Sequence, residues 1–190
     1  EQSIKVLRSV GIRTKTVDVG PFLAAAKLLY GGPWVAERYL ATSPLVEKSP
    51  GSLLPETRMI IEAGRQPSAV DAYQAQYELA GFKNQVVEFW KDFDFLALPT
   101  TGTIYRKKEI KENPIQLNSN LGHYTNFMNL LDLCGCAVPT SFREDGLPAG
   151  LTLFGPALHD QKVLHWSGKI HLAARTGAGV DREFIPEPLS

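Results

Sequence analysis

The sequence of residues 134–154, CGCAVPTSFREDGLPAGLTLF, contains two short apolar segments separated by a turn. Residues 134–138 and 151–154 are mostly apolar, which is typical of strands that are covered on both faces. The Glu-Asp-Gly tripeptide at 144–146 has the composition of a turn. We therefore predict two strands that pair with each other. A third short apolar segment, residues 95–98, predicts another buried strand.

The N-terminal segments have helical and strand-like patterns. Residues 2–10 predict a helix that ends at a glycine, and the alternation across residues 12–19 predicts a strand. Pro21 fits the first turn of a second helix, because its missing N–H needs no partner there. The Gly-Gly-Pro tripeptide at 31–33 interrupts this helix, which resumes over residues 34–41.

The longest predicted helix begins after Ser68, whose side chain can cap it together with Asp71. Residues at helical spacing form an apolar stripe along this helix. The stripe consists of Tyr73, Tyr77, Ala80, Val87 and Trp90. Because such stripes usually face a core, we expect this one to be buried.

The remaining segments predict two irregular connections and two further helices. Residues 42–67 predict a surface connection with one brief helix, and residues 100–123 predict a long loop. Helices are predicted at 127–133 and 163–173. Because helices and strands alternate, the predicted fold class is α/β, with a mixed sheet flanked by helices.

The composition excludes several classes of function. The 190 residues include 20 Lys and Arg and 20 Asp and Glu, so the formal net charge is zero and favours neither nucleic acid nor an anionic membrane as a partner. No apolar segment approaches the roughly 18 residues of a membrane helix. The two cysteines, Cys134 and Cys136, cannot build a disulfide framework, which favours a reduced, cytoplasmic protein.

Common catalytic and cofactor motifs are absent. The sequence has no Gly-x-Ser-x-Gly elbow, no glycine-rich phosphate loop and no Gly-x-Gly-x-x-Gly fingerprint, so we expect no nucleotide cofactor. The four histidines have no His-x-x-x-His spacing, so we expect no metal site. Cys134 or Cys136 with His123 would make a nucleophile and base pair. Both cysteines lie in a predicted apolar strand, where a free cysteine behaves as a small hydrophobe, and we favour that interpretation.

Tyr30 and Arg38 fall on roughly the same side of the interrupted helix. A guanidinium can hold a carboxylate through two parallel hydrogen bonds, and a phenol adds a donor, so the two residues suggest a site for a small acid. The alternative is structural: Arg38 pairs with Glu37 or another surface acid, and Tyr30 packs. The spacing alone favours the structural interpretation.

Residues 28–39, LLYGGPWVAERY, resemble the segment that marks allophanate hydrolases within the amidase-signature family. Other segments resemble the family in the same order along the chain. They are FLALPT at 95–100, LNS at 117–119, LGHYTNF at 121–127, NLLDL at 129–133 and GLPAG at 146–150. The resemblance covers about residues 4–175. It implies that residues 1–190 are the C-terminal portion of one amidase domain, with the N-terminal catalytic portion outside this chain.

The resemblance implies an enzyme of urea degradation that hydrolyses allophanate, a carboxylated urea, to ammonia and carbon dioxide. In this family a serine attacks the amide with the help of a second serine and a lysine. The sequence has no Gly-Gly-Ser-Ser-type segment, so no catalytic residue is assigned and the isolated chain is expected to be inactive. Tyr30 and Arg38 match the family residues that recognise the substrate carboxylate, which favours a ligand role for Arg38. Residues 118–126 are expected to border the pocket.

The resemblance also implies partners: the N-terminal half of the amidase domain, and a second copy in a homodimer. Where the missing half packs, the isolated chain is expected to expose a large apolar face. Two alternatives stay open. One is a non-catalytic subunit that binds a carboxylate or has a structural role, and the other is an amidase of different specificity.

Overall fold

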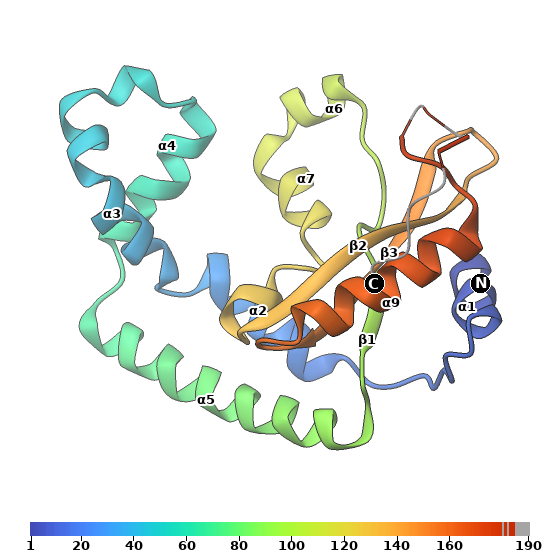
Figure 1. The fold of residues 1–190 in the computed structure, drawn as a ribbon. Coiled ribbons are helices and arrows are strands. Elements are labelled where there is room, and N and C mark those ends of the chain that lie inside the picture. The colour runs from blue at the N-terminus through green and yellow to red at the C-terminus, as the bar shows by residue number, and fades with distance from the viewer. Residues whose placement is uncertain (180, 182, 185–190) are drawn as a thin grey trace. The chain divides into compact units, whose positions relative to one another are not determined.

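The computed structural model describes residues 1–179, 181, 183 and 184 (Figure 1). The elements in chain order are α1 (Gln2–Ser9), α2 (Gly20–Gly31), α3 (Trp34–Lys48), η1 (Pro50–Ser52), α4 (Pro55–Glu62), η2 (Ala63–Arg65), α5 (Ala69–Asp92), β1 (Leu96–Pro99), α6 (Lys107–Glu112), α7 (Pro114–Leu121), α8 (Phe127–Leu130), β2 (Leu133–Phe142), β3 (Pro148–Pro156) and α9 (Asp160–Ala174). The chain divides into two compact units. The sheet unit comprises Glu1–Asp18, Phe89–Thr101 and Asp132–Ser190, and the helical unit comprises Val19–Glu88 and Gly102–Leu131.

The sheet unit contains a three-stranded sheet in the order β1-β3-β2. Both pairings are antiparallel, with Leu96 opposite Phe154 in one and Cys136 opposite Leu153 in the other. A tight turn joins β2 to β3: the Arg143 N–H donates to the Leu147 carbonyl at 2.8 Å, and Gly146 has a φ of +78°. Such a positive φ favours glycine. The three strands and the turn predicted from the sequence are confirmed, as is the α/β class.

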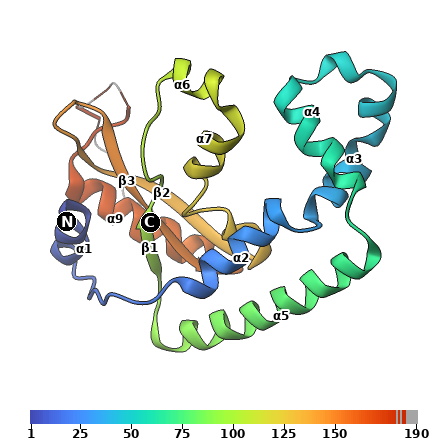
Figure 2. The same cartoon turned by 180° about the vertical axis from the view of Figure 1, so that it is seen from behind.

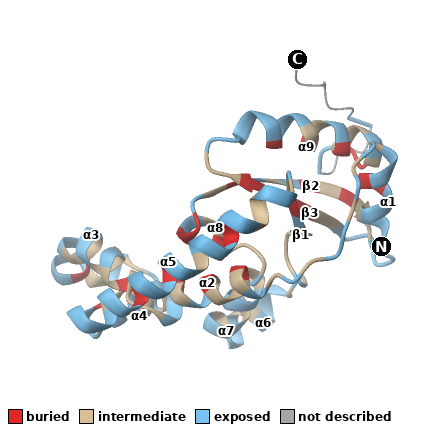
Figure 3. Cartoon of the chain, turned by 90° about the horizontal axis from the view of Figure 1, so that it is seen from below, coloured by how far each residue is buried: buried red, intermediate tan, exposed pale blue. Residues whose placement is uncertain are grey.

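The central strand β3 is covered on both faces. Leu153 and Phe154 point to opposite sides of the sheet, and their side chains are 1% and 0% exposed. Helices α1 and α9 contact the sheet, and α9 runs along it (Figures 1 and 2). The main cluster of buried apolar residues in this unit is Val6, Leu7, Val138, Leu151, Leu153 and Ile170. Figure 3 shows buried residues on the strands and on the side of α9 that faces them.

Helix α1 ends as predicted, but the segment after it is not a strand. Gly11 has a φ of +84°, and the N–H groups of Gly11 and Ile12 donate to the carbonyls of Arg8 and Leu7, which is a Schellman cap. Residues 12–19 then run in an irregular conformation and pair with none of the three strands. The alternation of side chains is present, but a strand also needs a neighbouring strand for its hydrogen bonds.

Helices α2 and α8 form the buried centre of the helical unit. Helix α2 has Pro21 in its first turn and ends at the Gly-Gly-Pro segment, as the sequence predicts. The rings of Phe22 in α2 and Phe127 in α8 meet edge to face, with centroids 5.4 Å apart, and both side chains are fully buried. This contact anchors the helix that ends next to Tyr30.

Two segments predicted to be largely irregular are more helical than expected. In residues 42–67, α3 continues to Lys48, and η1 and α4 begin at Pro50 and Pro55. In residues 100–123 the chain forms α6 and α7, with Pro114 in the first turn of α7. The prolines suggested breaks in the chain, but Pro50, Pro55 and Pro114 lie in the first turn of a helix, where a proline loses no hydrogen bond. Pro44, by contrast, lies inside α3.

Helix α5 is capped as predicted, but its predicted core stripe is wrong at four of its five residues; the fifth, Trp90, is half-buried. The Ser68 N–H donates to the Asp71 carboxylate at 2.8 Å, and the Asp71 N–H donates to the Ser68 hydroxyl at 3.2 Å. The stripe residues Tyr73, Tyr77, Ala80 and Val87 are exposed, and the buried residues are Ala75, Leu79 and Val86 on the opposite face. The spacing of apolar residues identified the helix correctly. The face that packs against the rest of this chain, however, is the one opposite the predicted stripe.

The cap predicts a pH dependence of stability. The hydrogen bonds from the Ser68 hydroxyl and N–H lower the pKa of Asp71. A lowered pKa in the folded state stabilises the fold above the ordinary pKa of about 3.9, and this contribution is lost as the pH falls through the lowered value. We expect Asp71→Asn to lower the urea midpoint of the complete protein near pH 6, with a difference from wild type that shrinks below pH 4. A difference that grows towards acid pH would contradict this.

No helix in the described ranges is both long enough and apolar enough to cross a membrane.

Candidate functional site

The tight turn between α2 and α3 positions Tyr30 and Arg38. The Gly32 N–H donates to the Leu28 carbonyl at 3.0 Å and closes α2. A Cβ on Gly32 would lie 2.5 Å from this same carbonyl oxygen, so the turn requires glycine. Helix α3 begins at once with Trp34, which brings Arg38 back over the end of α2.

The structure brings together the two residues selected from the sequence. The guanidinium carbon of Arg38 lies 4.8 Å from the centroid of the Tyr30 ring. This is a cation–π contact, in which the positive charge sits over the negative face of the ring. A cation–π contact does not use the N–H donors of the guanidinium in hydrogen bonds to an acid, so those donors can still bind a carboxylate.

The structure does not support the alternative ion pair for Arg38. Among the residues that it describes, no carboxylate forms an ion pair with Arg38, including that of the adjacent Glu37. The backbone carbonyl of Arg38 accepts a hydrogen bond from the Thr42 hydroxyl at 2.7 Å. The side chain of Arg38 is half-buried, and Tyr30 is 43% exposed. The guanidinium is therefore held by an aromatic ring and not by an acid.

Tyr30 also lines a cavity of about 300 Å³ inside the helical unit. Four helical elements besides α2 contribute to its wall: α3, α4, η2 and α7. The lining residues are Tyr30, Val35, Met59, Ile60, Ala63, Ile115, Asn118 and Ser119. Arg38 is not among them; it lies over the ring of Tyr30 instead.

The cavity wall is mostly apolar, with a few polar groups. The polar groups come from Tyr30, Asn118 and Ser119. Apolar walls with a small number of polar groups are typical of small-molecule sites, and 300 Å³ is at the small end of their range. Asn118 and Ser119 open the segment that was expected to border the pocket. Sequence reasoning missed the contribution of α4, since Met59 and Ile60 carry no chemical signal of their own.

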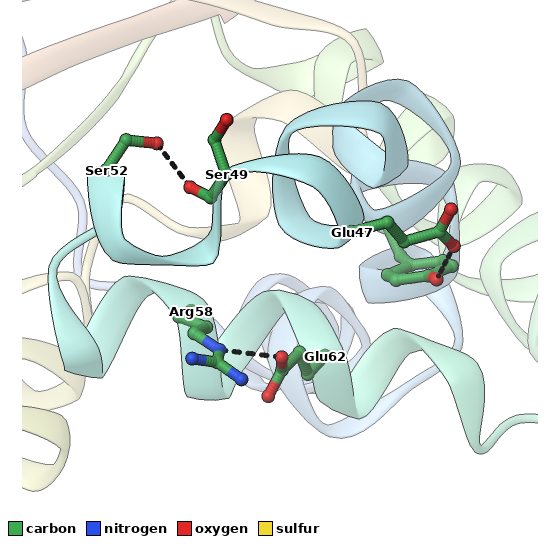
Figure 4. Close-up of polar contacts among 6 residues, drawn as sticks. Glu47, Ser49, Ser52, Arg58 and Glu62 are labelled. Atoms are coloured by element: carbon green, nitrogen blue, oxygen red, sulfur yellow. Dashed lines mark hydrogen bonds and ion pairs between the residues drawn. The ribbon is translucent and has the colours of Figure 1, made fainter.

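Polar contacts stabilise the helices that form one wall (Figure 4). The Tyr39 hydroxyl in α3 donates to the Glu47 carboxylate at 2.8 Å, and this hydrogen bond is the main reason that the pKa of Tyr39 is raised. In α4, Arg58 donates to Glu62 at 2.7 Å. These contacts are exposed to solvent, which weakens each of them.

The close approach of η2 to α3 is a stronger constraint on this wall. A Cβ on Gly64 would clash with the Val35 carbonyl oxygen and would lie 2.9 Å from the Tyr39 Cβ. Val35 and the neighbouring Ala63 both line the cavity.

Gly64→Ala is therefore expected to push η2 away from α3 and to destabilise the complete protein by about 1–3 kcal/mol. The decrease in the urea midpoint measures this. Gly51→Ala is the control, because a Cβ on Gly51 would meet nothing within 4 Å. Equal midpoints for the two variants would contradict the close contact.

Cys134 does not have the environment of a nucleophile. The thiol of Cys134 is buried and donates to the Pro156 carbonyl at 3.2 Å. Burial is the main cause that raises the pKa of Cys134, which disfavours the reactive thiolate. No group of three or more His, Cys, Asp or Glu side chains suited to a metal ion occurs within residues 1–179, 181, 183 and 184.

Comparison with known proteins identifies the family to which this chain belongs. Residues 1–164 match the family described as Amidase. The chain belongs to the amidase family. This amidase chain is 37% identical over 170 residues to urea amidolyase from Lachancea kluyveri, and 36% identical over 169 residues to urea amidolyase from Saccharomyces cerevisiae. Each match covers 88% of the amidase chain and 9% of the relative.

A solved structure extends the likeness to the whole chain. Allophanate hydrolase from Kluyveromyces lactis superimposes with a TM-score of 0.87 at 35% identity, covering all of the amidase chain and 31% of that protein. The resemblance drawn from the Leu28–Tyr39 segment is confirmed. The amidase chain therefore spans about a tenth of the urea amidolyases and a third of the allophanate hydrolase.

Proposed function

We propose that this amidase chain provides substrate recognition in an enzyme that hydrolyses allophanate during urea degradation. The observation that carries the proposal is the guanidinium of Arg38, which lies over the ring of Tyr30 and has no acid partner within the described part of the chain. Tyr30 in turn lines a small cavity. The similarity to a urea amidolyase and an allophanate hydrolase supports the choice of substrate.

The substrate's charge explains why an arginine suits this position. Allophanate differs from a neutral amide by one carboxylate, and arginine can hold a carboxylate through two parallel hydrogen bonds. A neutral substrate would leave the arginine without its partner, which costs binding energy. Tyr30 and Arg38 are thus proposed to bind the carboxylate and to select the substrate.

Bond cleavage is assigned to residues outside this chain. Amide hydrolysis by this route needs an activated serine, and the sequence has no Gly-Gly-Ser-Ser-type segment. We propose that residues 1–190 form the C-terminal part of one amidase domain in a cytoplasmic homodimer. Alone, the chain is expected to release no ammonia from allophanate.

The complete protein tests this function. Its kcat/KM should be at least tenfold higher for allophanate than for biuret, in which a neutral carboxamide replaces the carboxylate. Equal values would favour an amidase of other specificity. Binding of allophanate without release of ammonia would favour a non-catalytic subunit.

A further inference from the structure

Helix α7 presents two polar side chains to the cavity that Tyr30 also lines. Ile115, Asn118 and Ser119 line this cavity, and their spacing of three and four residues places them on one face of the helix. Within the part of the chain that the structure describes, the side chains of Asn118 and Ser119 form no hydrogen bond, and neither does the hydroxyl of Tyr30. All three polar groups can therefore bind a ligand.

The neighbouring face of the same helix is different. The side-chain amide of Gln116 donates to the side-chain oxygen of Asn120 at 3.0 Å, and the side-chain amide of Asn120 donates to the Tyr105 hydroxyl at 3.0 Å. None of these three residues lines the cavity. They join α7 to the segment before α6 and so support the fold. The polar residues on the cavity face of α7 have no such structural partner.

The donors and acceptors at the cavity suit a molecule with two different ends. The guanidinium of Arg38 can only donate hydrogen bonds, whereas the carboxamide oxygen of Asn118 can only accept them. The hydroxyl groups of Tyr30 and Ser119 can do either. Allophanate has the complementary groups: its carboxylate only accepts, and its urea end carries N–H donors.

We propose that Asn118 is a specificity-determining residue whose carboxamide oxygen accepts hydrogen bonds from the N–H groups of the substrate's urea end. Tyr30 and Arg38 hold the carboxylate at the other end. This inference rests on the proposed function and deepens it, because it names the residue that recognises the second end of the substrate. The cavity of about 300 Å³ has room for roughly ten water molecules, so a molecule as small as allophanate fits.

The apolar part of the wall makes the substrate depend on Asn118. The remaining lining residues are Val35, Met59, Ile60, Ala63 and Ile115. Their side chains offer no strong acceptor to an N–H group that has left water, and an N–H group without a partner costs binding energy. Removing the carboxamide of Asn118 should therefore weaken binding of any substrate that carries the urea end.

The test is steady-state hydrolysis of allophanate and of biuret by the complete protein. Both substrates carry the same urea end, and only allophanate carries the carboxylate. Asn118→Ala should lower kcat/KM for both substrates by the same factor, roughly 5- to 30-fold, and leave their ratio unchanged. The control is Gln116→Ala, which removes a carboxamide from the neighbouring face of α7 and should leave both values within about twofold.

Inhibition by acetate separates recognition of the urea end from a structural effect. Acetate has a carboxylate but no N–H group, so its inhibition constant should be the same for Asn118→Ala as for the wild type. A rise in this constant would show that the variant distorts the carboxylate site, and it would overturn the proposal. Equal kcat/KM values for Asn118→Ala and Gln116→Ala would overturn it too.

The outcomes for Asn118 and for the proposed function can be told apart. If the wild type prefers allophanate to biuret but Asn118→Ala has no effect, the proposed function stands and this inference fails. If Asn118→Ala changes the ratio between the two substrates, Asn118 acts on the carboxylate end and the inference also fails. A complete protein that hydrolyses neither substrate would contradict both.

Discussion

Arg38→Ala is expected to lower kcat/KM for allophanate in the complete protein by roughly 30- to 150-fold. The reason is the loss of a charged partner for the substrate carboxylate, which is worth about 2–3 kcal/mol at a partly desolvated site. In the structure the guanidinium has no other acid partner among the described residues, so its removal frees no buried carboxylate. Steady-state release of ammonia measures the effect.

Two variants separate charge from geometry in this experiment. Arg38→Lys keeps the positive charge but loses the planar pair of donors, so it should recover only part of the activity. Arg58→Ala removes an arginine of the same unit that pairs with Glu62 on the surface, and it should leave kcat/KM within about twofold. If Arg38→Ala and Arg58→Ala lowered kcat/KM for allophanate equally, a specific role for Arg38 would be contradicted.

Phe22→Ala is expected to cause the largest loss of stability, about 3–5 kcal/mol. The Phe22 side chain is 1% exposed and packs edge to face on Phe127, so truncation removes buried apolar area and leaves a cavity. The decrease in the urea midpoint of the complete protein measures this loss. Leu40→Ala in α3 is the control, because Leu40 is 76% exposed and its truncation should change stability by less than about 0.5 kcal/mol.

The same variant tests whether the site depends on this packing. Phe22 lies in α2, the helix that carries Tyr30 near its end, so Phe22→Ala should also weaken substrate use at temperatures where the protein stays folded. If the urea midpoint of Phe22→Ala equalled that of Leu40→Ala, Phe22 would not anchor this helix.

The sequence predicted those parts of the fold that local chemistry determines. The apolar strands, the Gly146 turn, the glycine that ends α1 and the Ser68 cap all follow from a few adjacent residues. The segment 12–19 failed as a strand because strand formation depends on a distant partner. Helices α6 and α7 are six and eight residues long, too short for periodicity to identify them.

For similar reasons, only part of the candidate site could be predicted from the sequence. Tyr30 and Arg38 carry recognisable chemistry at helical spacing, and the structure places one over the other. The apolar wall from α4 and α7 depends on how helices pack, which no short segment encodes. The stripe on α5 was recognised, but periodicity cannot say whether an apolar face meets this chain's own core or another surface.

The central claim is that Arg38 selects the substrate by its carboxylate. The most direct test is the ratio of kcat/KM for allophanate to kcat/KM for biuret, measured for the complete wild-type protein and for Arg38→Ala. We predict that the ratio falls at least tenfold in the variant, because only allophanate loses a charged contact. An unchanged ratio, with both substrates affected alike, would contradict the claim.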